Sequence, residues 1–362
     1  MPGGAAVLRR LLDAGLVSPA EVVDGEVSLH DVSRSNSVYL VTAGDRPPVA
    51  AKACLADRPV GQGDPALERA FYRALAANGV GPADLPVPAL VAAADDLLVL
   101  GALDGAETLE RRIRAGGPAS SAACLFGAAL ARWRRMADRI DWSALPLRGA
   151  EPWALTVATP DEPPFVAEYP ALRRMAREVA DRTGLCRRLG ELRRGWRRRG
   201  VIHGDIRWDN TLIVPGRRDR VVLVDWEFVD LGDPAWDIAG AVADALLNAV
   251  LPLDHGNCDG LLAPEGLGRL CACLDWFLGS FGSAYAQVAG GEDLDAGAAL
   301  VPARLVQNAF QLAAHDGESG FESGVALLGL AASLVEAPDL LGRWLGGLPV
   351  GAGATAGGPR PP

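Results

Sequence analysis

Two aspartates and an asparagine stand at a spacing that suits phosphoryl transfer. Asp205 is the first, Asn210 follows five residues later, and Asp225 stands fifteen residues after the asparagine. Transfer from a nucleotide needs a carboxylate near the attacking hydroxyl, together with an amide oxygen and a second carboxylate that hold Mg²⁺. We therefore predict that Asp205 is the catalytic base or orienting group, and that Asn210 and Asp225 are the Mg²⁺ ligands.

The residues after Asn210 predict a β-hairpin that positions this set. Residues 212–214 and 221–224 are short apolar runs, and residues 215–219 between them are typical of a turn. The second run ends at Asp225, so the hairpin would bring oxygens from two segments to one metal. An ordinary polar loop is the alternative, but the complete set at this spacing favours the catalytic interpretation.

The motif His203-Gly204-Asp205 with Asn210, and the later Asp225-Trp226, resemble the aminoglycoside phosphotransferase and choline-kinase branch of the protein-kinase-like fold. The resemblance extends over roughly residues 26 to 340. It implies an α+β, bilobal protein-kinase-like fold with a small antiparallel-sheet N-lobe, a larger helical C-lobe, and ATP with Mg²⁺ between them.

We expect four segments along the chain. We expect an N-terminal helical segment at 1–25, an N-lobe with the nucleotide loop, lysine and hinge at 26–103, a helical C-lobe with the catalytic loop and acceptor site at 104–345, and a disordered tail at 346–362.

The resemblance requires an N-lobe lysine that binds the ATP phosphates. The chain has 35 lysines and arginines, of which Lys52 is the one lysine, and it lies in the strand-like run 48–53. Residues 64–75 predict a helix that Asp64 caps. Glu68 in its first turns is the predicted partner of Lys52; the alternative is that this acid only complements the helix dipole.

Two further segments would contact the nucleotide. The loop between the strand-like runs 27–32 and 38–41 has no glycine, so Ser35 and Asn36 side chains would bind phosphate in place of close backbone N–H groups. A plain polar turn is the alternative. The resemblance also implies a hinge whose backbone reads the adenine, and it places this contact at Gly101, Ala102 and Leu103.

Other charged residues surround the catalytic motif. Arg207 could stabilise charge on the transferring phosphoryl group, and Asp209 could pair with it, help the metal or meet a cationic acceptor. The alternative is a solvent-exposed Arg207–Asp209 ion pair that contributes little. By resemblance, His203 and Asp237 support the site structurally.

Composition excludes several classes of function. The net charge of −10 argues against a general nucleic-acid-binding protein. The sequence has neither a long uncharged apolar stretch nor a signal-peptide core, so we expect a cytoplasmic protein with no membrane partner. The arginine-rich run 187–199 predicts a helix with a solvated basic face, or with a surface for an acidic partner.

The acceptor hydroxyl has two candidate classes. One is a peptide Ser or Thr, as in kinases of class V lanthipeptide or thioamitide-type biosynthesis, where a separate partner lyase would be needed. The residues of the runs 203–210 and 225–237 resemble those kinases and slightly favour this class. The other is a small molecule such as an amino alcohol or an aminoglycoside. A non-catalytic pseudokinase scaffold is a third interpretation, which the glycine-free nucleotide loop favours and the complete Lys52-to-Asp225 set opposes.

Overall fold

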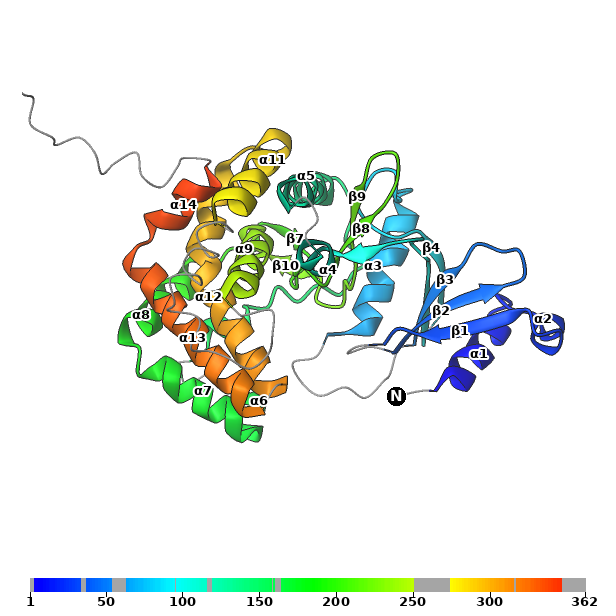
Figure 1. Cartoon of the computed structure of the whole chain (residues 1–362), viewed down its shortest axis with the longest axis horizontal. Coiled ribbons are helices and arrows are strands. Elements are labelled where there is room, and N and C mark those ends of the chain that lie inside the picture. The colour runs from blue at the N-terminus through cyan, green and yellow to red at the C-terminus, as the bar shows by residue number, and fades with distance from the viewer. Residues whose placement is uncertain are drawn as a thin grey trace, which may run out of the picture.

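The computed structural model describes residues 3–33, 37–53, 63–94, 96–115, 119–157, 159, 164–250, 274–315 and 317–346. A sheet-rich part lies at one end of the molecule and a set of helices lies at the other (Figure 1). Between them lie the strands β7 (Gly200–Ile202), β8 (Thr211–Val214), β9 (Arg220–Leu223) and β10 (Asp230–Gly232). The prediction of an α+β fold, with a sheet at the N-terminal side and helices at the C-terminal side, is confirmed.

The N-terminal sheet is antiparallel, in the strand order β1-β2-β3-β5-β4. Its strands are β1 (Val27–Asp31), β2 (Ser37–Ala43), β3 (Val49–Ala53), β4 (Leu90–Ala94) and β5 (Leu97–Gly101). The helices α1 (Gly4–Asp13) and α2 (Pro19–Val23) precede it.

The two faces of this sheet carry different hydrophobic clusters. Along β5, Leu97 and Val99 pack with α1, whereas Leu98 and Leu100 pack in the cluster that contains α3 (Pro65–Ala77). Successive side chains of a strand point to opposite faces. On β3, Ala51 and Ala53 belong to the α1 side, so the side chain of Lys52 between them points to the α3 side.

The helix α3 forms as its sequence predicts. The carboxylate of Asp64 accepts hydrogen bonds from the N–H groups of Ala66 and Leu67, at 2.9 and 3.4 Å. Pro65 stands at the first helical position, where its missing N–H is not needed. The cap fixes where the helix begins, and it therefore sets the position of Glu68 in the first turn.

The predicted hairpin after the catalytic motif is confirmed as β8 (Thr211–Val214) and β9 (Arg220–Leu223), with Leu212 opposite Val222. The strand β6 (Glu107–Thr108) extends this sheet beside β8, and β7 (Gly200–Ile202) pairs with β10 (Asp230–Gly232). The catalytic motif thus runs from the end of β7 to the start of β8, anchored at both ends by strand pairing.

The helical part buries the larger hydrophobic cluster. Its helices are α4 (Leu109–Arg114), α5 (Ala119–Ala137), α6 (Pro164–Glu168), α7 (Pro170–Ala180), α8 (Thr183–Gly195), α9 (Ala235–Val250), α11 (Gly279–Ala289), α12 (Glu292–His315), α13 (Gly317–Glu336) and α14 (Asp339–Leu345). Short 3₁₀ and π-helical turns occupy Trp153–Leu155 and Leu274–Leu278. Within the described ranges, no helix combines the length and apolar character that crossing a bilayer requires.

The predicted arginine-rich helix corresponds to α8, which ends at Gly195, before the last arginines of the run. Leu189 is buried, as the inner face requires, and Trp196 is the C-cap residue rather than an inner-face residue of the helix. The predicted tail lies outside the described residues from 347 onward.

Candidate active site

The ammonium group of Lys52 lies among three carboxylates. Its Nζ is 2.6 Å from Glu68 Oε2, is hydrogen-bonded to Asp225 Oδ1, and is 3.6 Å from Glu227 Oε2. Burial opposes the charged form, but the three carboxylates outweigh it and raise the pKa of Lys52 above its ordinary value. Lys52 therefore stays protonated, and its surroundings keep an excess of negative charge.

Glu68 links α3 to the segment that follows β9. Its second oxygen, Oε1, accepts the backbone N–H of Trp226 at 3.0 Å. The Trp226 ring is fully buried and stacks on Phe71 of α3, with ring centroids 4.2 Å apart. The sheet, α3 and the metal-ligand candidate Asp225 are thus tied together through one glutamate and one tryptophan.

The backbone around Asp225 is held in an unusual conformation. Among the described residues, Asp225 is the only non-glycine residue with a positive φ, which is 68°. L-residues rarely adopt this conformation, and it clusters at functional sites. Val224 donates its N–H to the Asn210 carbonyl at 3.0 Å, and its carbonyl bonds His203 Nε2 at 3.0 Å. These bonds bring Asn210 and Asp225 to the same region.

The catalytic motif turns sharply at Gly204, which has a φ of 83°. A Cβ there would lie 2.3 Å from the Phe228 carbonyl oxygen, so the close approach excludes any side chain. Both carboxylate oxygens of Asp237 accept backbone N–H groups here, from His203 at 2.8 Å and from Gly204 at 2.9 Å. Burial raises the pKa of Asp237, and these bonds and Arg304 oppose that rise.

His203 is fully buried and supports the loop through both ring nitrogens. Its Nδ1 accepts the N–H of Asp205 at 3.3 Å, which leaves Nε2 as the donor to the Val224 carbonyl. The histidine therefore connects the loop that carries Asp205 to the residue before Asp225.

The two oxygens of Asp205 have different surroundings. Asn210 Nδ2 donates to Asp205 Oδ2 at 3.1 Å and to its carbonyl at 2.9 Å. Asp205 Oδ1 is buried and has no hydrogen-bond partner among the described residues. Because the amide nitrogen of Asn210 is used by Asp205, its carbonyl oxygen is the atom left for a metal.

Arg207 and Asp209 form an ion pair at 3.7 Å, with about a third of each side chain exposed. Arg207 also lies in the field of Asp205, Asp244 and Asp225; although burial opposes its charge, these carboxylates raise its pKa. Asp244 of α9 accepts the N–H of Trp208 at 2.6 Å. The structure thus places Arg207 within a set of acids rather than in a simple pair.

Glu110 of α4 joins this set from a distant part of the chain. The pairing of β6 with β8 brings α4 beside residues 209–211, and Glu110 shares a hydrogen bond with Asp209. Burial first, and then Asp209, raise the pKa of Glu110 to about 7, against the opposing charge of Arg114 at 2.7 Å. We refer to Glu110, Asp209 and Asp244 as the acidic cluster.

The hinge candidates lie at the end of β5 and directly after it. The N–H of Gly101 donates to Ala89 and that of Ala102 donates to Pro48, at 2.8 and 3.0 Å. Within the described chain, the N–H of Leu103 has no such backbone acceptor. Of the three N–H groups, that of Leu103 is therefore the one left to donate to a nucleotide base. Ser35 and Asn36, the phosphate-loop candidates, lie outside the described residues.

Sequence reasoning gave no role to four residues that the structure places here. They are Glu110, Glu227, Asp244 and Arg304. Asp244 and Arg304 are single charges inside apolar helical runs, a pattern that signals a buried charge with a specific partner. Glu227 could have been predicted, because it stands two residues after Asp225 in the same motif. Glu110 lies in an ordinary charged helix, and its neighbours in the sequence do not indicate a role in the site.

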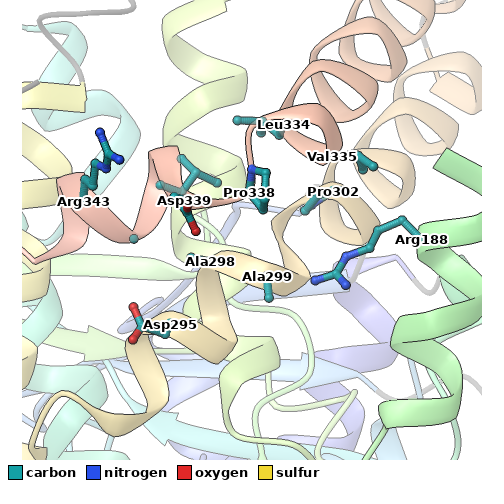
Figure 2. A pocket seen from close by; sticks show the side chains of 12 residues that line it. Arg188, Asp295, Ala298, Ala299, Pro302, Leu334, Val335, Pro338, Asp339 and Arg343 are labelled. Carbon is teal, nitrogen blue, oxygen red and sulfur yellow. The ribbon is translucent and has the colours of Figure 1, made fainter. Parts of the chain in front are cut away.

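A cavity of about 520 Å³ lies elsewhere, between α8, α12, α13 and α14. Figure 2 shows that Arg188, Pro302 and Leu334 line it from three different helices. The lining contains no residue of the catalytic motif or of the acidic cluster, so this cavity is separate from the site described above.

Residues 26–272 match the Phosphotransferase enzyme family. The chain belongs to that family. The match covers more than half of the chain and contains the catalytic motif, Lys52 and Asp225. This phosphotransferase is therefore an enzyme that transfers a phosphoryl group to a hydroxyl acceptor, and the scaffold interpretation is set aside.

Solved structures show that the phosphotransferase has the protein-kinase-like fold. A choline kinase of Cryptosporidium parvum superposes with a TM-score of 0.57, at 12% identity over 94% of this chain and 99% of that one. An ethanolamine kinase of Plasmodium vivax gives 0.55, at 11% identity over 91% and 88%. An aminoglycoside phosphotransferase gives 0.50, at 14% identity over 88% and 99%.

Among curated proteins, the phosphotransferase is 34% identical over 83 residues to the probable acyl-CoA dehydrogenase IBR3 of Arabidopsis thaliana. The alignment covers 20% of this chain and 10% of the length of that protein. A similarity of this extent carries neither the activity nor the partners of the plant protein to this one.

Proposed function

We propose that this phosphotransferase moves the γ-phosphate of ATP, in a Mg²⁺-dependent reaction, to the hydroxyl of a small acceptor that also carries a positive charge. The acidic cluster beside the catalytic motif is the observation that supports this acceptor class. Counted together with Asp205, its members outnumber the cations that face them: the carboxylates of Glu110, Asp209, Asp244 and Asp205 lie around Arg207, Arg114 and Arg304.

Burial first, and the neighbouring Asp209 second, raise the pKa of Glu110. A carboxyl group with a pKa of about 7 beside another carboxylate is only partly ionised at neutral pH. An acceptor ammonium would relieve the repulsion and let Glu110 ionise. An amino alcohol or amino sugar carries both the ammonium and the hydroxyl that this arrangement requires.

Each catalytic side chain has a proposed role. The carboxylate of Asp205, whose side chain is 11% exposed, accepts the proton of the acceptor hydroxyl. Lys52, oriented by Glu68, binds the phosphates, and Leu103 contacts the adenine through its N–H. Arg207 stabilises charge on the transferring group, and Ser35 and Asn36 complete the phosphate loop.

The residues present fit a bound Mg²⁺. The carbonyl oxygen of Asn210 and the carboxylate of Asp225 are oxygen ligands of the kind that Mg²⁺ prefers, and the three carboxylates around one lysine leave negative charge for it to neutralise. When bound, the ion would neutralise charge on the phosphates. His203 and Asp237 hold the loop that presents Asn210.

A peptide Ser or Thr is the second candidate acceptor. Arg187, Arg194, Arg197 and Arg198 are exposed in or just after α8, and none of them has a carboxylate partner in the described part of the chain. In a protein of net charge −10, such a basic surface suits an acidic peptide segment. A peptide acceptor would imply a role in lanthipeptide- or thioamitide-type biosynthesis, together with a separate lyase.

One assay separates the two acceptors. Mass spectrometry of a pool of amino alcohols, amino sugars, neutral polyols and Ser/Thr-rich peptides, after incubation with Mg²⁺·ATP, should show phosphate on an amine-bearing compound and none with Asp205→Asn. Glu110→Gln should raise KM for that compound about tenfold and leave KM for ATP unchanged, since it removes one charge from the acceptor side. Phosphate confined to peptides would overturn the proposed acceptor class.

A further inference from the structure

Arg304 of α12 is a buried charge that the roles given above do not use. Only 1% of its surface is exposed, and it interrupts the apolar run 298–306. A guanidinium in such a place is costly unless its donors are satisfied. Its partners therefore indicate what it does.

The guanidinium reaches the catalytic loop across a separation of 100 residues in the sequence. Nη1 donates to the Gly204 carbonyl at 3.1 Å, and Nη2 donates to the Ile206 carbonyl at 3.2 Å. Nη1 also bonds Gln307 Oε1 at 3.0 Å. The planar fork of arginine thus holds the carbonyls on both sides of Asp205 at once.

The same guanidinium faces the oxygen that Asn210 leaves open. Arg304 Nη2 is 3.7 Å from Asp205 Oδ1, whereas Asn210 bonds Oδ2. The ring of Trp236 lies against the guanidinium, with Cζ 5.0 Å from its centroid, and Trp236 Nε1 donates to the Gly204 carbonyl at 3.2 Å. Arg304 and Trp236 therefore act on the same turn of the loop.

The packing around Arg304 leaves little room for movement. A Cβ on Gly240 of α9 would lie 2.7 Å from the Ile206 carbonyl oxygen and 3.0 Å from Arg304 Nη2. The absence of a side chain at Gly240 allows the guanidinium and the loop to meet. Pro302, two residues earlier on α12, instead lines the separate cavity (Figure 2).

We infer that Arg304 is a positioning residue for phosphoryl transfer, which fixes Asp205 through the carbonyls of Gly204 and Ile206 so that its carboxylate is presented to the acceptor hydroxyl. This inference rests on the proposed role of Asp205. Through Arg304, the helix α12 sets the position of the catalytic carboxylate, while Lys52 and Glu68 set the position of the nucleotide.

Arg304→Met, Arg304→Lys and Leu305→Ala test this role. Leu305 is the next buried position of α12 and controls for lost packing. We expect Arg304→Met to lower kcat about 100-fold, because a small displacement of a catalytic group has an effect of that size. The KM for ATP, and the Kd for ADP without Mg²⁺, should stay within about threefold of wild type. Arg304→Lys should recover part of kcat, and Leu305→Ala should leave it near wild type.

Hydrogen exchange gives a readout that needs no acceptor. The peptide covering residues 203–210 should exchange faster in Arg304→Met than in wild type, and the nucleotide-side peptides around Lys52 should not change. If Arg304→Met does not fold, Arg304→Lys keeps the charge but loses the planar fork that donates to both carbonyls, and a lower kcat with faster exchange at 203–210 is expected.

Two results would overturn the inference. One is a folded Arg304→Met or Arg304→Lys protein with unchanged exchange at 203–210; the other is a kcat loss that Leu305→Ala reproduces. Absence of phosphate transfer by wild type in every acceptor assay would count against the proposed function instead. The exchange comparison would still decide whether Arg304 holds the loop.

Discussion

At the scale of single residues, the carboxyl group of Glu110 links the stability of the protein to pH, because burial and the neighbouring Asp209 disfavour its charged form. Its pKa is raised to about 7, so the folded protein takes up a proton that the unfolded chain, with an ordinary value of 4.5, releases. The free energy of unfolding therefore has its full contribution from this group below pH 4.5 and loses it as the pH rises through 7.

This sign gives a measurable prediction. Between pH 5 and pH 8, the melting temperature of wild type should fall by at least about 2 °C more than that of Glu110→Gln, because the variant has no proton to lose. Glu107→Gln, on the adjoining strand, controls for the loss of one carboxylate. Parallel melting curves for wild type and Glu110→Gln would show that the crowding of acids around Asp209 has no energetic effect.

At the scale of elements, the sequence predicts what local interactions determine. The cap at Asp64, the hairpin of β8 and β9, and the strand that carries Lys52 each depend on neighbours within a few residues, and each is confirmed. Arg304 and Glu110 were missed for the opposite reason. Their partners lie about 100 residues away in the sequence, and an isolated charge in a helix does not indicate which distant segment it will meet.

The cap of α3 connects local structure to the site. Asp64→Ala should lower the free energy of unfolding by about 1 kcal/mol, as loss of an N-cap usually does, and should raise KM for ATP about twofold to fivefold, since the first turn carries Glu68. Asp64→Asn keeps a capping oxygen and should behave like wild type in chemical denaturation and in the ATP titration. Equal losses in both variants would assign the effect to the charge of Asp64 and not to the cap.

At the scale of the whole molecule, Lys52 is the cation that joins the N-terminal sheet to the segment after β9. Glu68 comes from α3, whereas Asp225 and Glu227 come from beyond the catalytic hairpin. The lysine therefore neutralises acids from both parts of the protein, in the place where Mg²⁺ and phosphate are proposed to bind. Its removal would leave buried carboxylates facing one another, which costs about 3 kcal/mol or more.

Lys52→Met should therefore lower the melting temperature in buffer without divalent ions. Addition of Mg²⁺ alone should raise the melting temperature of the variant by more than it raises that of wild type. The reason is that a cluster of carboxylates without its lysine binds a divalent ion more tightly, and binding to the folded state stabilises it. Phosphate transfer by Lys52→Met should be lost whatever the Mg²⁺ concentration, because the ion does not replace the contact to the nucleotide phosphates.

The double variant Lys52→Met with Asp225→Ala should lose the extra response of the melting temperature to Mg²⁺, and NaCl at matched ionic strength should not produce that response. A Mg²⁺ response equal in wild type and Lys52→Met would mean that Asp225 and its neighbours do not form the metal site, and that the single lysine joins the two parts of the protein for structural reasons alone.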